Sequence, residues 1–297
     1  MRLFTKIFGS ALLIPTSVLG ISRYENKNLK VENYRIKSAR LPDMFDDFKI
    51  VFLSDLHAVS FGEGNHKLIE QIDRIHPDMI LVGGDMIVGK KDQTTEVAYE
   101  LLHHLAMGYP VVCANGNHEY RMKLYRELYG TRYDCYVSDL RASGVTYLEN
   151  NSIKIIKNGE SITVTGLELA RKYYQRGAKT PMQPAYLNKV LGSKIKNQFQ
   201  ILLAHNPLYF PEYAKWGADL VLSGHNHGGL IRLPFLGGLV SPQMTFFPQY
   251  DAGYYCIGDS QMIISRGLGT HTFPIRVWNR PELSVIHLQG EKKEKAE

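Results

Sequence analysis

The chain has 297 residues, of which 44% are hydrophobic and 22% charged, a composition that excludes a fibrous or largely disordered protein. The formal net charge of +6 favours anionic partners such as phosphorylated substrates or acidic lipid head groups, although it is equally compatible with a simple solubility feature. The three cysteines lie far apart and form no C-x-x-C pair, so they predict neither a disulfide framework nor a zinc-thiolate site.

The first predicted element is an apolar N-terminal segment. Arg2 and Lys6 precede a mostly apolar stretch from Ile7 to Ile21, and no clean Ala-x-Ala cleavage site follows it. A basic start before about 15 apolar residues is typical of a secretory signal, whereas a membrane span usually needs about 20. We interpret residues 1–22 as a signal peptide or a retained membrane anchor, with a buried helix as a third alternative. The protein is therefore expected at the cell membrane or exported.

Apolar strands then alternate with helices, after a polar segment at residues 23–46 that we interpret as a linker. Residues 47–289 are assigned to one domain, and residues 290–297 to a polar tail. The order of elements predicts an α/β core, with one or two sheets covered by helices. Strands are expected at 48–54, 78–82, 109–114, 152–156, 161–166, 199–204 and 218–223, with short β runs at 254–288. Helices are expected at 65–76, 94–107, 121–143, 184–192 and 208–216.

Five of these strands end at residues that can bind metal ions. Because ligands bind beyond the carboxyl ends of strands in α/β sheets, five such ends would converge on one cleft. A single histidine at a strand end is more often structural than a ligand, but the ordered set of five is hard to obtain by chance. The five sites are Asp55-Leu-His57, Asp85, Asn117-His118, His205 and His225-Asn-His227.

The residue types at these sites predict the chemistry. Carboxylate, amide and imidazole ligands without a thiolate suit Mn²⁺, Fe or Zn²⁺ in an open catalytic site. Two neighbouring cations need a bridging carboxylate, and Asp85 lies in the middle of the ligand order. A water shared by two such ions would lose a proton near neutral pH and become a hydroxide nucleophile. We therefore expect a phosphoesterase with two divalent metal ions, Mn²⁺ being favoured over Fe or Zn²⁺.

These motifs resemble the calcineurin-like metallophosphoesterase superfamily. Its pattern is Asp-x-His, Gly-Asp, Gly-Asn-His-Asp/Glu, His and Gly-His-x-His, and every element is present in order from Asp55 to His227. The stretches Gly224-His-Asn-His-Gly-Gly229, Ser265-Arg-Gly-Leu-Gly-Thr270 and Arg280-Pro-Glu282 are similar to a membrane-associated bacterial branch that includes UDP-2,3-diacylglucosamine pyrophosphatase-like phosphodiesterases. The resemblance covers about residues 48–288 and implies a four-layer α/β/β/α sandwich with a dinuclear metal site at the carboxyl ends of the strands.

The resemblance also implies a role for each site residue. One ion would be held by Asp55, His57 and His227, and the other by Asn117, His205 and His225, with Asp85 bridging the two. His118 would not bind metal, but would face the scissile phosphate and protonate the leaving oxygen or stabilise the developing charge. Glu119, the next residue, is expected either to orient His118 or to be a solvated turn carboxylate.

Three late residues, Arg266, His271 and Arg276, are candidates for substrate binding, because arginine suits phosphate oxygens. Surface or structural arginines are the alternative. The segment from Leu230 to Tyr255 is rich in Gly, Pro and aromatic residues, and is expected either to border the cleft and meet an acyl chain or membrane, or to be a packed irregular loop.

The leading prediction is hydrolysis of a phosphodiester or pyrophosphate near a membrane, in a phosphorylated small-molecule or lipid-linked substrate. The alternatives are a broad phosphomonoesterase and a non-catalytic metal-binding envelope protein. His118 and all seven expected ligands are present, which argues against the non-catalytic alternative. Nucleic acid is not an expected partner, because no strip of aromatic and basic residues stands out.

Overall fold

The computed structural model describes residues 19–175, 179–229, 231–233, 235–240, 245–270 and 275–291. His271, most of the expected signal or anchor segment (residues 1–18) and most of the expected tail (residues 292–297) lie outside the described residues. Residues 19–27 form a helix. No helix within the described ranges is both long and apolar enough to cross a membrane.

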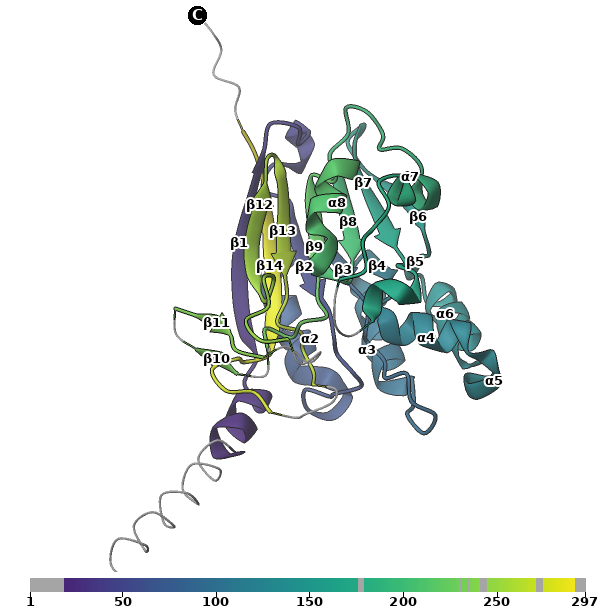
Figure 1. The fold of residues 1–297 in the computed structure, drawn as a ribbon, viewed down its shortest axis with the longest axis vertical. Helices are drawn as coiled ribbons and strands as arrows, with labels where there is room; N and C mark the ends of the chain where they lie inside the picture. Colours follow the sequence, from purple (N-terminus) through teal and green to yellow (C-terminus); the bar gives the residue numbers. More distant parts are fainter. Residues whose placement is uncertain are drawn as a thin grey trace, which may run out of the picture.

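Two six-stranded sheets form the centre of the molecule (Figure 1). The first contains β1 (Lys30–Ser38), β2 (Lys49–Leu53), β3 (Met79–Val82), β4 (Val111–Ala114), β5 (Thr146–Leu148) and β14 (Glu282–Gly290), in the order β1-β14-β2-β3-β4-β5. The second contains β6 (Asn151–Lys157), β7 (Glu160–Leu167), β8 (Gln200–Ala204), β9 (Leu220–Ser223), β12 (Gly253–Ile257) and β13 (Ser260–Ile264), in the order β12-β13-β9-β8-β7-β6.

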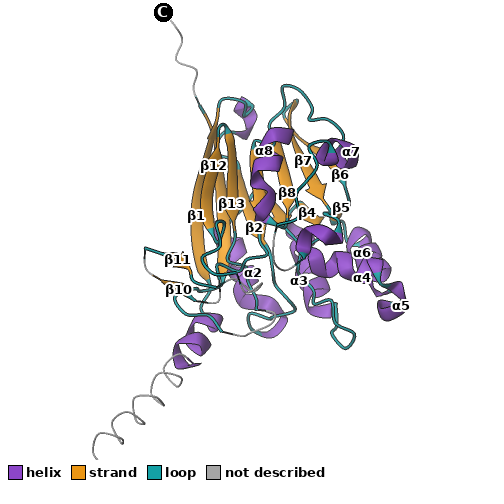
Figure 2. Cartoon of the chain, viewed as in Figure 1, coloured by secondary structure: helices purple, strands orange, loops and turns teal. Residues whose placement is uncertain are grey.

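Helices cover the outer face of each sheet (Figure 2). Those beside the first sheet are α2 (His66–Ile75), α3 (Glu96–Gly108), α4 (Asn117–Leu124), α5 (Arg126–Tyr129) and α6 (Arg132–Ala142). Those beside the second are α7 (Tyr186–Leu191) and α8 (Phe210–Trp216). Short 3-10 helices are η1 (Asp43–Phe45), η2 (Glu63–Asn65), η3 (Arg171–Tyr174) and η4 (Pro207–Tyr209), and a small hairpin pairs β10 (Arg232–Leu233) with β11 (Gly237–Gly238).

Alternation along the buried strands explains the layers. In β2, Ile50 and Phe52 join the core between the sheets, whereas Val51 and Leu53 face the helices of the first sheet. The next strands in both sheets alternate in the same way, because successive side chains point to opposite faces. Strands buried on both faces read as continuous apolar runs, as the sequence showed. The predicted four-layer α/β/β/α sandwich is confirmed.

The prediction of a linker at residues 23–46 is wrong. Residues 30–38 form β1, which pairs in parallel with β14 along its whole length. The strand escaped detection because it lies at the edge of the sheet, where most of its side chains stay partly exposed and Ile36 is the one that is buried. Its partner β14 is also longer than the short runs expected, since all nine of its residues pair with β1.

The parallel strands set the position of the site. β2, β3 and β4 run parallel in the first sheet, and β7, β8 and β9 do so in the second. The carboxyl ends of neighbouring parallel strands lie along one edge, and the predicted metal-binding residues follow β2, β3, β4, β8 and β9 directly.

Candidate metal centre

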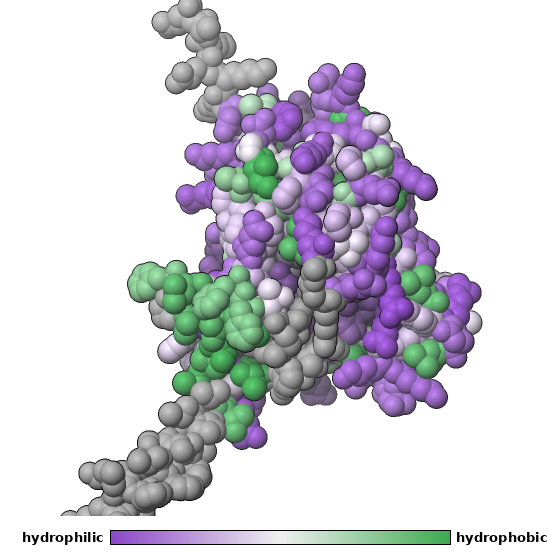
Figure 3. Space-filling model, viewed as in Figure 1, coloured by the Kyte–Doolittle hydropathy of each residue, from purple (hydrophilic) through white to green (hydrophobic). Residues whose placement is uncertain are grey.

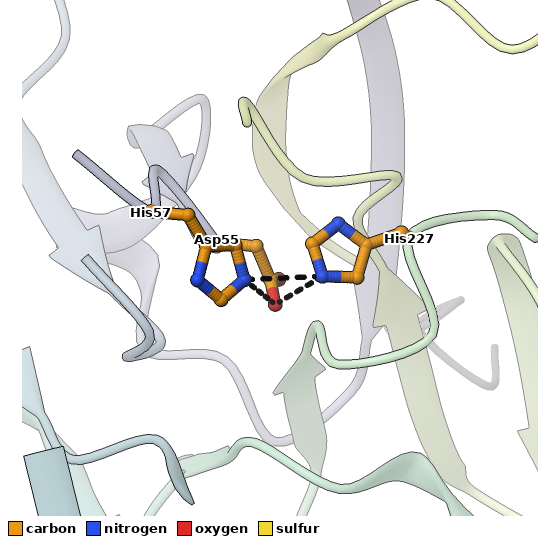
Figure 4. Close-up of side chains that lie close together, drawn as sticks. All are labelled: Asp55, His57 and His227. Carbon is orange, nitrogen blue, oxygen red and sulfur yellow. Dashed lines mark hydrogen bonds and ion pairs between the residues drawn. The ribbon is translucent and has the colours of Figure 1, made fainter. Parts of the chain in front are cut away.

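The structure brings the predicted histidines and aspartates into one cluster. Three sets of buried or half-buried side chains have potential ligand atoms within 4.8 Å of one another. Two coincide with the sets that the family resemblance assigned to the two ions, apart from the amide of Asn117. The sets are Asp55, His57 and His227 (Figure 4), then Asp85, His205 and His225, and finally His57, Asp85 and His118.

Asp85 presents one oxygen to several imidazoles. Its Oδ1 accepts a hydrogen bond from the backbone N–H of His118 at 2.8 Å, which fixes the carboxylate. Its Oδ2 lies 3.1 Å from Nε2 of His205 and 3.9 Å from Nε2 of both His57 and His118. A fixed carboxylate with one oxygen aimed at ligands from several strands suits a group that bridges two cations.

Asp55 has the same arrangement. Its Oδ2 accepts hydrogen bonds from the Ser54 hydroxyl and the backbone N–H of His225. Its Oδ1 lies 3.4 Å from Nε2 of His227 and 3.7 Å from Nε2 of His57. Burial alone would raise the pKa of Asp55, but the charges of His227 and His205 outweigh burial and hold that pKa well below its usual range. The carboxylate form that a metal requires is therefore favoured.

The second nitrogen of each ring shows which histidines can coordinate a cation. Nδ1 of His205 lies 2.8 Å from the carbonyl oxygen of Gly83, and Nδ1 of His227 lies 3.1 Å from that of Gly269. A carbonyl can only accept, so Nδ1 carries the proton in both rings. In the neutral form of each ring, Nε2 then carries the lone pair and points at the aspartates, as in histidines that bind metals.

His118 has the opposite polarity. Its Nδ1 accepts a hydrogen bond from the backbone N–H of Gly89 at 2.8 Å. In the neutral ring the proton must then sit on Nε2, which lies 3.9 Å from Oδ2 of Asp85. Distance alone groups His118 with the possible ligands, but its hydrogen bonding makes Nε2 a hydrogen-bond donor. This polarity supports a hydrogen-bond donor that stabilises developing charge on the substrate, rather than a metal ligand.

The cluster fits divalent metal ions. Oδ1 of Asn117 is buried without a hydrogen-bond partner, which costs about 1–3 kcal/mol for a polar atom unless another group satisfies it. Burial lowers the pKa of His205, but Asp85 and Asp55 outweigh burial and raise it to about 10, so the carboxylates attract positive charge to this position. Oxygen and nitrogen donors of this kind suit Mn²⁺, Fe or Zn²⁺.

The backbone at the cluster is unusual. Asp55, His57, Asp85, His225 and His227 all have positive φ angles, between 48° and 72°. Non-glycine residues rarely adopt this left-handed conformation, and such residues gather at functional sites. The glycines beside them permit close approach, since a Cβ on Gly84 would collide with the backbone N of Gly116. Strained turns thus bring the carboxylates and imidazoles inward.

Glu119 is buried, so the prediction of a solvated turn carboxylate is wrong. Its carboxylate accepts hydrogen bonds from the backbone N–H groups of Asp85 and Met86 at 2.8 Å, of Ile87 at 3.2 Å and of Gly116 at 3.0 Å. Burial and the charge of Asp85 raise the pKa of Glu119 to about 7, against the effect of these donors. Glu119 therefore joins the loop after β3 to the loop after β4.

The two predicted substrate arginines are engaged within the fold. Arg266 lies 3.4 Å from a carboxylate oxygen of Glu32 and 3.4 Å from one of Glu282. Arg276 is 1% exposed and donates to the backbone carbonyls of Arg266, Gly267, Gly269 and Asn279. Gly269 is also the residue whose carbonyl orients His227, so Arg276 supports a candidate ligand from behind. Binding of phosphate by either arginine stays a prediction.

Sequence reasoning missed a pocket of about 290 Å³ beside Asn117. Arg121 lies one helical turn after Asn117, and this i, i+4 spacing on a helix could have indicated that Arg121 lies beside the predicted metal site. The ring of Tyr174 lies 5.4 Å from that of His225, and the Arg171 guanidinium lies 5.1 Å from the centre of the Tyr125 ring. The pocket is lined by Asn117, Tyr120, Arg121, Leu124, Tyr125, Arg171, Tyr174 and Gln175.

Comparisons with known proteins agree with this geometry. The family profile described as calcineurin-like phosphoesterase matches residues 48–229. The uncharacterized metallophosphoesterase YkuE of Bacillus subtilis is 30% identical over 279 residues, covering 91% of this chain and 90% of that protein. Phosphodiesterase YaeI of Escherichia coli is 28% identical over 86% of this chain and 88% of its own. A Danio rerio transmembrane protein with a metallophosphoesterase domain is 26% identical over 93% of this chain and 62% of its own. The chain belongs to the calcineurin-like phosphoesterase family and is a metal-dependent phosphoester hydrolase.

Proposed function

We propose that the protein hydrolyses a phosphodiester or pyrophosphate bond in a phosphorylated substrate held near a membrane. The observation that carries this proposal is the arginine-lined pocket beside the metal centre. A phosphodiester has a second ester group, and a pyrophosphate has a second phosphate. A pocket beside the metal centre can hold that group while the nucleophile attacks the other phosphorus or ester bond. A phosphomonoester does not need such a pocket to the same extent.

In this proposal the residues of the site have three roles: metal binding, stabilisation of the leaving group and substrate binding. Divalent metals, Mn²⁺ being favoured, would lower the pKa of a bound water and neutralise charge on the phosphate. Asp55, Asp85, Asn117 and the histidines other than His118 would hold them. His118 would donate a hydrogen bond from Nε2–H to the leaving oxygen and stabilise its developing charge, since its Nδ1 accepts from the N–H of Gly89. Arg121 and Arg171 would bind the remaining anionic group of the substrate.

The names of two relatives support the finer parts of the proposal. YaeI of Escherichia coli is named a phosphodiesterase, which favours a diester substrate. The Danio rerio relative is named a transmembrane protein, which favours a location at the membrane. The apolar segment from Ile7 to Ile21 points in the same direction.

The first experiment uses the full-length chain in mild detergent, stripped of metal and then given Mn²⁺, Fe²⁺ or Zn²⁺. Hydrolysis of a bis-aryl phosphodiester, an aryl phosphomonoester and a pyrophosphate diester is compared. We expect added metal to restore cleavage of the diester or the pyrophosphate. Cleavage of the monoester alone would favour the broad phosphatase, and two bound ions without turnover would favour the non-catalytic envelope protein; either result overturns the proposal.

The pocket is tested with Arg121→Ala and Arg171→Ala. Each variant should raise KM for the pyrophosphate about tenfold, because a hydrogen bond to a charged group contributes about 1.5–3 kcal/mol. KM for the aryl monoester should change little. Arg74→Ala is the matched control, since Arg74 is exposed on α2 and pairs with Glu70. Equal effects of all three variants would remove the pocket from the proposal.

A further inference from the structure

One face of the molecule carries a group of exposed apolar side chains (Figure 3). Sixteen large apolar side chains are exposed within the described residues. Eight of them lie in residues 19–24, 235–236 and 246–247 and at Trp278. Phe235, at the tip of the β10–β11 hairpin, is 108% exposed, which means that it projects fully into solvent. We call this group the apolar rim. It consists of Leu19, Ile21, Tyr24, Phe235, Leu236, Phe246, Phe247 and Trp278.

Backbone pairing joins these segments into one surface. Phe246 forms a β-bridge with Val240, directly after the hairpin. Ile231 bridges to Val277, which places Trp278 beside the start of the hairpin. The N-terminal helix is attached to the same loop, because the hydroxyl of Ser22 accepts from the N–H of Arg276 at 3.0 Å.

The apolar rim is also tied to the metal centre. Asn279 is fully buried, and its amide donates to the backbone carbonyls of His227 and Gly229. Its own N–H donates to the carboxylate of Glu25 on the N-terminal helix at 2.8 Å. Arg276 holds Gly269, whose carbonyl orients the ring of His227. Through backbone and side-chain hydrogen bonds, the buried residues Arg276 and Asn279 therefore connect the N-terminal helix to one candidate metal ligand.

The sequence of the N-terminal apolar segment indicates what covers the apolar rim. The apolar stretch from Ile7 to Ile21 enters the structure at residue 19, within the apolar rim itself. Removing exposed Phe and Leu side chains from water is favourable, so several together favour transfer into an apolar phase. Protruding Phe and Trp side chains on a protein with net charge +6 suit the boundary between head groups and acyl chains of an anionic bilayer.

We propose that the apolar rim inserts into the surface of an anionic lipid bilayer and holds the metal centre next to it. If the metal centre lies at the bilayer surface, the substrate class is a phosphoester carried by a lipid. This assignment of the substrate rests on the proposed function. The membrane contact itself does not depend on that function. The N-terminal segment would provide the tether, and the apolar rim would set how the catalytic domain faces the lipid.

The two tryptophans of the chain provide the test. Trp278 is 57% exposed in the apolar rim, whereas Trp216 is 9% exposed on α8. The full-length chain is reconstituted into vesicles of phosphatidylcholine and phosphatidylglycerol with or without brominated acyl chains. The difference in emission between the wild type and Trp278→Phe reports Trp278 alone. We expect bromine to reduce that emission by about half or more, because an interfacial side chain lies about 5–10 Å deep.

A combined variant, Phe235→Ser, Leu236→Ser, Phe246→Ser and Phe247→Ser, should lose most of this quenching. It should keep metal-restored cleavage of the soluble bis-aryl diester, which shows that it folds. The control is Met107→Ser with Ile156→Ser, two side chains 67% and 70% exposed outside the apolar rim. This control should retain full quenching. Because the N-terminal segment is present in every variant, the assay measures contact of the apolar rim and not simple tethering.

Three outcomes would overturn the proposal. Trp278 could remain as accessible to aqueous acrylamide with vesicles as without them, or the quadruple variant could be quenched like the wild type. Shielding of Trp278 that depends on protein concentration and not on lipid would assign the surface to a second copy of the chain. Quenching without hydrolysis of any phosphoester would instead leave the membrane contact standing and overturn the proposed function.

Discussion

The loop after β8 and the first turn of α4 each place a histidine near the same carboxylate oxygen, but the two rings have opposite hydrogen-bond polarity. Nε2 of His205 lies 3.1 Å from Oδ2 of Asp85, and Nε2 of His118 lies 3.9 Å from it. The His205 ring donates through Nδ1 to a carbonyl, whereas the His118 ring accepts through Nδ1 from an amide. The polarity of this second hydrogen bond, more than distance, separates a metal ligand from a hydrogen-bond donor.

The largest effect is expected from Asp85→Asn, which removes the charge that both histidines share. Activity should fall at least about a thousandfold, because metal ions contribute several kcal/mol and 1.36 kcal/mol corresponds to a factor of ten. Metal content measured by mass spectrometry should also fall. Asp92→Asn, at an exposed position, is the matched control. Full activity with two bound ions in Asp85→Asn would contradict a bridging role.

The different roles of His118 and His205 are tested by replacing each of them with alanine. His118→Ala should keep its metal content and lose about a hundredfold to a thousandfold in turnover, the range for a lost hydrogen-bond donor to developing charge. His205→Ala should lose both turnover and metal, because a ring with a free Nε2 lone pair is removed. Metal content and kcat are measured on the same samples. Metal loss in His118→Ala would show that His118 is a ligand.

A smaller effect, on stability, is expected from Glu119→Gln. The carboxylate accepts hydrogen bonds from four backbone N–H groups. In the variant, the side-chain amide nitrogen of glutamine would face two of these N–H groups, and it cannot accept a hydrogen bond from them. The variant should lose about 2–3 kcal/mol in free energy of unfolding, the cost of leaving buried donors unsatisfied. Urea denaturation of the metal-free protein measures this loss. A change within error would mean that this carboxylate does not hold the loops of Asp85 and His118 together.

The smallest effect is expected from Gly89→Ala, because the N–H of Gly89 donates to the ring of His118. A Cβ on Gly89 would lie 3.3 Å from Nδ1 of His118 and 3.1 Å from its carbonyl oxygen, so Gly89→Ala should displace the ring slightly. We expect kcat to fall about tenfold, since a small misplacement of a catalytic group is costly, while metal content is retained. Gly108→Ala, with open space around it, is the control. An unchanged kcat in Gly89→Ala would show that this amide does not position His118.

Local patterns in the sequence were enough for most of the fold. The continuous apolar runs of β2, β3, β4, β8 and β9 predicted buried strands, and their ends predicted which residues would meet. β1 was missed, because an edge strand whose side chains are mostly only partly buried carries no distinct pattern of apolar residues. Sequence patterns left open whether the segment from Leu230 to Tyr255 meets a membrane or packs as an irregular loop, since Phe235 reads like any residue of an aromatic loop.

Residue patterns alone identified the superfamily, the strand ends and the donor atoms that a metal could use. Only the tertiary structure decided what each side chain does, because the deciding partners lie far away in the chain. The amide that sets the polarity of His118 is 29 residues distant, and the carbonyl that orients His205 is 122 residues distant. The burial of Arg276 likewise depends on a loop and a helix packed around it. Hydrogen-bond polarity and burial are properties of neighbours in space, which residue spacing does not record.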